Sequence, residues 1–175
     1  MMRNMTILPG ALLIGLLCMV GNSVALAAEA GDQTTVRITG VIQARPVCTV
    51  SSGKQIQVSF GNNVAVNRVS TGEYVANVPY SVTCGSGNTT GAALKLRVYG
   101  SEASFDAERA TVVSAQQADL GVKLYQNDVP FVLNQPITIV RTALPEIKAV
   151  LVQREGATLT EGAFTATATL RAEYQ

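Results

Sequence analysis

The stretch GAFTATATLRAEYQ, residues 162–175, guides the interpretation of the rest of the chain. Apolar residues occupy every second position from Phe164 to Tyr174, and Thr, Arg and Glu residues fill the positions between them. A period of two places the two sets on opposite faces of a β-strand. We therefore expect a strand that buries its apolar face and turns its threonine-rich face toward water.

The apolar face of this strand carries mostly small side chains. Its inward positions are Phe164, Ala166, Ala168, Leu170, Ala172 and Tyr174. Half of them are alanines, which line a groove more readily than they fill a core. Because the strand is the last one in the sequence, we expect its sheet to be completed by another segment.

The first residues have the order of a secretory signal peptide. Arg3 precedes an apolar run at residues 11–20, and small residues follow at 25–28. This order predicts a signal peptide at residues 1–27, with cleavage after Ala27 or Ala28. The alternative, an anchoring helix, is disfavoured because the apolar run is too short to span a membrane.

The composition argues against catalysis and against nucleic-acid binding. Only 14% of the chain is charged, and loss of Arg3 reduces the 13 basic residues to 12, which equals the number of acidic residues. No basic patch of the kind that binds nucleic acid is visible. The chain has no histidine, so it lacks the base of a Ser-His-Asp or Cys-His pair. We expect no enzyme activity, no cofactor and no small-molecule substrate.

Two cysteines, Cys48 and Cys84, remain after the signal peptide. In a secreted chain they most simply form one disulfide bond. Such a bond typically stabilises a domain by about 2–4 kcal/mol. The alternatives are two free thiols or a two-ligand metal site, and the metal site is weak because no histidine completes the shell.

Further segments of period two, separated by turn residues, predict seven or eight short strands and no helix. These segments are residues 47–50, 56–60, 74–84, 94–98, 120–125, 129–133, 137–140 and 147–152. Short strands at such regular spacing are typical of an all-β sandwich of the immunoglobulin type.

A second alternating segment, TTVRITGVIQ at residues 34–43, lies ahead of these strands. One phase contains Thr34, Val36, Ile38, Gly40 and Ile42. Glycine weakens a strand interior and often marks the close approach of another backbone. Pro46 separates this arm, residues 28–45, from a domain at residues 46–175. Either the arm folds back as the first strand of its own sandwich, or it adds a strand to a neighbour.

Taken together, these features resemble a subunit of a chaperone–usher fimbria, a pilin of the type 1 and P pilus class. The pilin end pattern is a glycine fourteen places from the C-terminus, alternating apolar residues and a penultimate tyrosine, matched here by Gly162, residues 164–172 and Tyr174. The arm resembles the pilin donor strand, and Cys48 and Cys84 lie where pilins place their disulfide. The resemblance covers nearly the whole chain.

The resemblance implies an incomplete immunoglobulin-like β-sandwich that lacks its last strand and is completed in trans by donor-strand complementation. Side chains at Thr34, Val36, Ile38 and Ile42 of the arm would enter a neighbour's groove, and Gly40 would pass where that groove is shallow. This chain's own acceptor groove and chaperone-binding surface would comprise Gly162, Phe164, Ala166, Ala168, Leu170, Ala172, Tyr174 and Gln175.

The resemblance also implies partners and a location. The partners are a periplasmic pilus chaperone, an outer-membrane usher and neighbouring pilin subunits. The chain would be exported through the periplasm to the cell-surface fimbrium, where it would contribute to bacterial cell adhesion as a minor or adaptor subunit. A terminating subunit is a second possibility for its place in the fibre. The alternative from another class is a secreted, self-complete immunoglobulin-like binding module.

Overall fold

The computed structural model describes residues 34–175, so the predicted signal peptide lies outside the described residues. Residues 41–175 form one compact unit. In chain order its strands are β1 (Cys48–Val50), β2 (Val75–Asn77), β3 (Val82–Cys84), β4 (Leu94–Gly100), β5 (Thr111–Val113), β6 (Leu120–Gln126), β7 (Val129–Pro130), β8 (Pro136–Thr138), β9 (Ile147–Gln153) and β10 (Ala168–Tyr174). Two short 3-10 helices, Ser51–Gly53 and Val66–Thr71, are the helical turns of the described chain, which confirms the all-β prediction.

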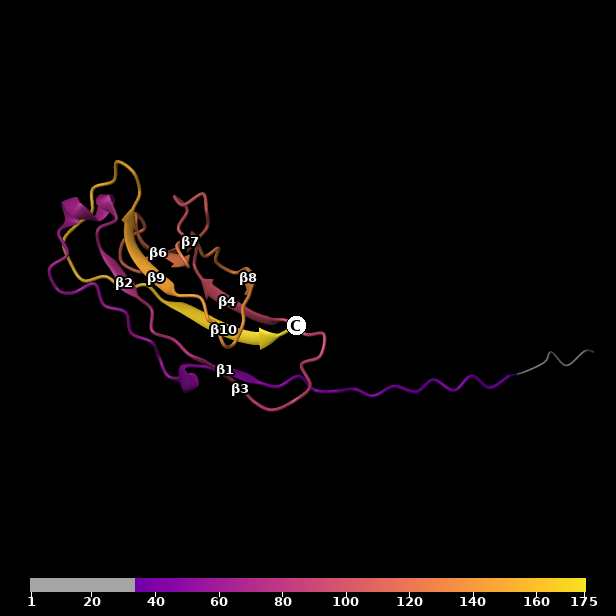
Figure 1. The fold of residues 1–175 in the computed structure, drawn as a ribbon. Helices are drawn as coiled ribbons and strands as arrows, with labels where there is room; N and C mark the ends of the chain where they lie inside the picture. Colours follow the sequence, from indigo (N-terminus) through magenta and orange to yellow (C-terminus); the bar gives the residue numbers. More distant parts are fainter. Residues whose placement is uncertain (1–33) are drawn as a thin grey trace, which may run out of the picture. The chain divides into compact units, whose positions relative to one another are not determined.

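The strands form three antiparallel sheets. The largest has the order β2-β9-β6-β5, with β7 paired to β6, and the second has the order β10-β4-β8. The third pairs β1 with β3. Figure 1 shows β10 running alongside β4 within the second sheet. None of the described residues forms a helix that is long and apolar enough to cross a membrane.

One apolar core joins the two larger sheets. Alternate residues of β4 and β9 are buried, as a period of two requires. Leu96 and Val98 of β4 share a cluster of buried side chains with Leu124 of β6 and Ala149 of β9. The inner faces of the two sheets therefore pack against each other, which is the arrangement of a β-sandwich.

Several predicted strands are confirmed and others are wrong. The segments at 94–98, 120–125 and 147–152 correspond to β4, β6 and β9. The predicted strand at 74–84 is two strands, β2 and β3, because Pro79 lies between them and cannot donate to a ladder. The return strand at 129–133 is limited to β7, and residues 56–60 form no strand.

Two alternating segments are less regular than their pattern predicts. The last strand begins at Ala168 and not at Gly162, because Ala168 pairs with Gly100, the last residue of β4. The arm at 34–43 forms no strand, and its aliphatic side chains are exposed: 75% for Val36, 91% for Ile38 and 101% for Ile42. Alternation shows which face of a strand is apolar, but a strand also needs a partner for its backbone.

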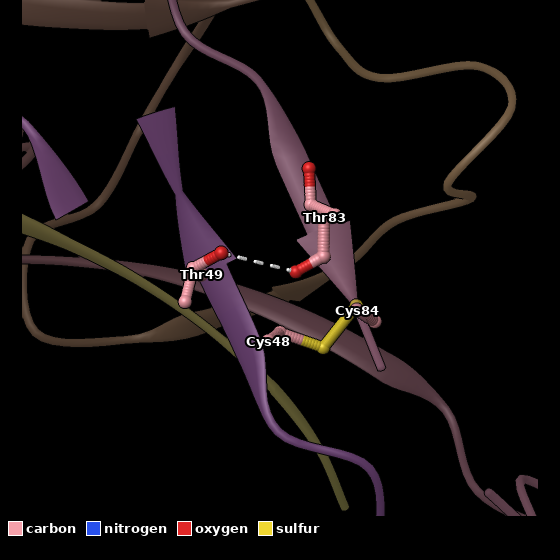
Figure 2. The surroundings of a disulfide bond; sticks show 4 residues. All are labelled: Cys48, Thr49, Thr83 and Cys84. Carbon is pink, nitrogen blue, oxygen red and sulfur yellow. Dashed lines mark hydrogen bonds between the residues drawn. A yellow bond between two sulfur atoms is a disulfide. The ribbon is translucent and has the colours of Figure 1, made fainter. Parts of the chain in front are cut away.

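The predicted disulfide bond is confirmed. Cys48 of β1 and Cys84 of β3 are directly opposite each other in the ladder, and their sulfur atoms are bonded (Figure 2). At the next pair, the Thr49 hydroxyl donates to the Thr83 carbonyl at 3.4 Å. Because the bond uses both thiols, the free-thiol and metal-site alternatives for these cysteines are wrong.

A buried carboxylate fastens the segment that covers the outer edge of β5. Asp106 accepts hydrogen bonds from the Thr111 hydroxyl at 2.7 Å and from the Ala110 N–H at 3.0 Å, and it pairs with Lys123 at 3.2 Å. Burial acts to raise the pKa of the Asp106 carboxyl, but these hydrogen bonds outweigh it and hold the pKa below the usual 3.8. The ionised carboxylate therefore stabilises the folded state.

We expect Asp106→Ala to lower the free energy of unfolding at pH 7 by about 2–3 kcal/mol, because it leaves buried donors without an acceptor. Urea unfolding of the disulfide-bonded chain measures this. Glu73→Ala, which removes an exposed ion pair with Arg68, is the control and should change stability by less than about 1 kcal/mol.

The stability that the Asp106 carboxylate contributes should be lost as the pH falls. A lowered folded-state pKa contributes stability fully above the ordinary value of 3.8, and the contribution is lost as the pH falls through the lowered value. The wild type and Asp106→Ala should therefore converge in acid. A difference that stays constant from pH 7 to strongly acidic pH would contradict this account.

Candidate functional site: the groove beside the last strand

The last strand, β10, has one paired edge and one open edge. In its sheet β10 is the outermost strand, and it pairs only with β4 among the described strands. Gln175 and Ala93 exchange both backbone hydrogen bonds at 3.0 Å, so the odd-numbered residues of β10 bond to β4 in this register. The even-numbered residues therefore point their N–H and C=O groups away from β4, toward the open edge.

A large apolar groove lies along this open edge. Its volume is about 1750 Å³, and residues 157–170 and 53–62 both line it. Its floor consists of buried or partly buried apolar residues from both sheets, namely Val98, Val112, Val122, Leu124, Ile147, Ala149 and Leu151. Lys54 and Glu161 are the charged residues of its lining. The groove thus offers a long apolar floor beside unpaired backbone.

A smaller hollow of about 370 Å³ extends the lining toward the C-terminus. It lies between residues 45–50, which include β1, and residues 170–174 of β10. Val50 and Leu170 line both the groove and the hollow. Together they follow β10 along its whole length.

The predicted acceptor residues all lie along this edge. Gly162, Phe164, Ala166, Ala168 and Leu170 line the groove, and Leu170, Ala172 and Tyr174 line the hollow. Gln175 lies past the hollow and bonds to Ala93. The expectation of a buried face is only partly right, because Ala172 is buried whereas Ala168 is exposed. Ala168 is exposed because it lines the open groove, where no described strand covers its side chain.

The opposite wall of the groove consists of residues that the sequence did not mark as part of the site. Ile56, Val58 and Phe60 line it, and the Phe60 ring lies 6.3 Å from the Phe164 ring across the groove end. Their alternation alone predicts an ordinary strand. No local signal in the sequence separates these residues from an ordinary strand, because their lack of a backbone partner among the described residues is visible only in the fold.

The shape and chemistry of the groove suit an extended peptide. Unpaired backbone on β10 can bond to a strand, and the apolar floor can take the alternate side chains of that strand. No group of three or more Cys, Asp or Glu side chains that could hold a metal ion occurs within residues 34–175. The unpaired backbone and the apolar floor of the groove therefore suit the addition of a β-strand.

The predicted donor residues lie in exposed chain. Thr34, Val36, Ile38, Gly40 and Ile42 are all exposed and outside regular secondary structure. At Gly40 an added Cβ would meet no atom within 4 Å, so packing inside this chain does not require a glycine there. The base of the arm is anchored, because Arg45 donates to the Thr90 carbonyl at 3.1 Å and Pro46 is buried.

Comparisons with known proteins agree on one family. A family model described as "Fimbrial protein" matches residues 36–175. The chain is 30% identical over 166 residues to the uncharacterized fimbrial-like protein YfcQ of Escherichia coli strain K12, covering 91% of this chain and 96% of that protein. It is 29% identical over 164 residues to YfcR, another uncharacterized fimbrial-like protein of that strain, covering 86% and 87% of the two chains.

Solved structures show the same fold. The P pilus rod subunit PapA matches with a TM-score of 0.55 and 18% identity, over 81% of this chain and all of that one (100%). The P pilus adaptor subunit PapF matches with a TM-score of 0.52 and 22% identity, over 75% of this chain and 98% of that one. At these identities the likeness shows the fold, which is that of pilins with an immunoglobulin-like sandwich.

Hydrogen exchange of the isolated chain should show the open edge of β10 directly. We expect the amides of Ala168 and Leu170 to exchange quickly, because they face the open edge, and those of Thr169 and Arg171 to be protected by β4. Residue-resolved NMR exchange on the same sample measures both sets, so the odd-numbered amides act as the internal control. Equal protection of both sets would mean that another segment already covers this edge.

Proposed function

The chain belongs to the fimbrial protein family, and from this premise we propose that it is a structural subunit of a chaperone–usher fimbria that polymerises by donor-strand exchange. Membership in a family of structural proteins confirms the prediction that the chain is not an enzyme. The proposed role is to form one link of the fibre and so to contribute to bacterial cell adhesion.

The observation that carries this proposal is the open edge of β10 beside an apolar groove. A strand inserted between β10 and residues 54–60 would bond to the even-numbered residues of β10 and cover the groove floor. That strand would be the last strand that the sandwich lacks. Each buried Val or Ile side chain would stabilise the joint by about 1.5–3 kcal/mol before entropy losses.

The arm supplies a strand of the required kind. Val36, Ile38 and Ile42 expose aliphatic side chains on alternate residues, and a neighbour's groove would remove them from water. Thr34 shares their phase, and Gly40 would pass a shallow point of that groove. The same subunit would thus donate one strand and accept another, which is the requirement for a linear fibre.

The open edge also explains why a chaperone is part of the proposal. An unpaired apolar edge is an aggregation hazard before assembly. A periplasmic pilus chaperone would cover the groove and hold the terminal carboxylate of Gln175, and the outer-membrane usher would exchange it for the arm of the next subunit. Export through the periplasm to the cell surface follows from this route. Within the fibre we propose a minor or adaptor position.

Strand exchange can be tested with the full chain bound to its periplasmic pilus chaperone. We expect a synthetic arm peptide, residues 34–45, to displace the chaperone slowly and to remain in the groove. Native mass spectrometry follows both species over time. A chain that is a stable, soluble monomer without chaperone and takes up no peptide would favour the self-complete binding module instead.

Gly40 provides a second test, on the donor side. Gly40→Leu should slow the assembly of chaperone-bound subunits into fibres by about tenfold or more, because a side chain would meet the shallow part of the groove. The unfolding free energy of the subunit itself should not change, since a Cβ at Gly40 meets nothing within 4 Å.

The matched control for Gly40 is Thr39→Leu, in the opposite phase of the arm, where a larger side chain would point out of the groove. Assembly of this variant should stay close to the wild-type rate. If Gly40→Leu instead destabilises the isolated subunit, the arm packs into its own domain and the proposal of a donated arm is wrong.

A further inference from the structure

Gln117, in the loop between β5 and β6, binds one wall of the groove. Its Oε1 accepts a hydrogen bond from the Thr160 N–H at 2.9 Å, and its Nε2 donates to the Thr160 carbonyl at 2.9 Å. A residue of an adjacent antiparallel strand makes this same pair of bonds with its partner. The Gln117 side chain therefore substitutes for a strand at Thr160.

Gln116, the preceding residue, binds the same wall five residues further along. Its Oε1 accepts from the Thr165 N–H at 2.7 Å, and its Nε2 donates to the Thr165 hydroxyl at 3.0 Å. The Ala115 N–H donates to the Thr165 carbonyl at 2.8 Å. Both backbone groups of Thr165 thus point toward the β5–β6 loop and away from the groove.

These contacts fix which backbone groups of the wall face the groove. In residues 158–167, the backbone hydrogen bonds to other described residues all go to Ala115, Gln116 and Gln117. Thr165 is in phase with the odd-numbered residues of β10 that bond to β4. Phe164 and Ala166 must therefore turn their N–H and C=O groups toward the groove, in phase with Ala168 and Leu170.

We propose that Gln116 and Gln117 form a glutamine clamp, a pair of positioning residues that keeps the first half of the acceptor edge ready for an incoming strand. At Thr165 the clamp continues the register of β4 beyond Gly100, where β4 ends, whereas at Thr160 the Gln117 contact holds the wall in the other phase. This inference rests on the proposed function, because the clamp acts through the strand that the groove accepts. Without the clamp, residues 158–167 would have to become ordered on binding, so the bound strand would leave sooner.

The test measures how long an arm peptide stays in the groove. The full chain is prepared with its chaperone, a fluorescent peptide of residues 34–45 replaces the chaperone, and loss of the label is followed in excess unlabelled peptide. The double variant Gln116→Met with Gln117→Met keeps a similar side-chain length but loses the amide bonds. We expect it to release the peptide about tenfold faster than the wild type. Gln126→Met, at the end of β6 and outside the groove lining, is the control and should match the wild type.

Charge replacements separate positioning from general packing. Gln116→Glu keeps an acceptor for the Thr165 N–H, so its release rate should stay within about twofold of the wild type. Gln117→Glu places an oxygen against the Thr160 carbonyl in place of a donor, so it should release the peptide as quickly as Gln117→Met. If the two glutamines only filled space, Gln116→Glu and Gln117→Glu would have similar effects on the rate of peptide release.

Two failures of this experiment have different meanings. If the wild type takes up no peptide at all, the proposed function is wrong, and so is the proposal of the clamp that rests on it. If the wild type takes up peptide and the double variant holds it equally long, strand uptake stands and the clamp is wrong. Equal release by Gln116→Glu and Gln117→Glu would also overturn the clamp.

Discussion

Within residues 34–175, the backbone of β10 is hydrogen-bonded on one edge only, and the rest of the structure depends on this constraint. Its odd-numbered residues bond to β4, whereas its even-numbered residues carry both the apolar side chains of the groove and the unpaired backbone groups. The even-numbered residues of β10 thus present apolar side chains and unpaired backbone groups to the same groove. A strand with alternating apolar side chains satisfies both at once.

The remaining fold supports this open edge without closing it. The disulfide between Cys48 and Cys84 holds β1, beside the hollow, to β3. Asp106 fastens the segment that covers β5 at the far edge of the other sheet. The disulfide bond stabilises the sandwich beside the hollow, and the Asp106 contacts stabilise it at the edge far from β10, so the domain does not depend only on the core that the groove leaves exposed.

Much of the site could be predicted from local patterns. The alternation from Phe164 to Tyr174 predicted the face that lines the groove. The alternation and the glycine of the arm predicted a strand-forming segment, but they left open whether it completes its own sandwich or that of a neighbour. The pairing of Cys48 with Cys84 followed from their being the two cysteines of the mature chain. Each of these conclusions depends on residue identity and a period of two, which a sequence shows directly.

The rest depends on contacts between residues that are distant in sequence. Alternation could not show that β10 begins at Ala168, because its start is set by the end of β4 at Gly100. Residues 56–60 alternate like a strand, yet they form a wall of the groove because no described segment pairs with their backbone. Gln116 contacts Thr165 over 49 positions, and no local signature marks a glutamine that substitutes for a strand. Such contacts become visible only once the fold is known.

The central claim is that a donated strand occupies the open edge of β10 in the assembled state. Amide hydrogen exchange of this chain inside intact fibres tests it most directly. The account predicts that the amides of Ala166, Ala168 and Leu170 become as well protected in the fibre as those of Thr169 and Arg171. If these even-numbered amides exchange as quickly in the fibre as in the isolated chain, no strand has bonded to this edge and the account is contradicted.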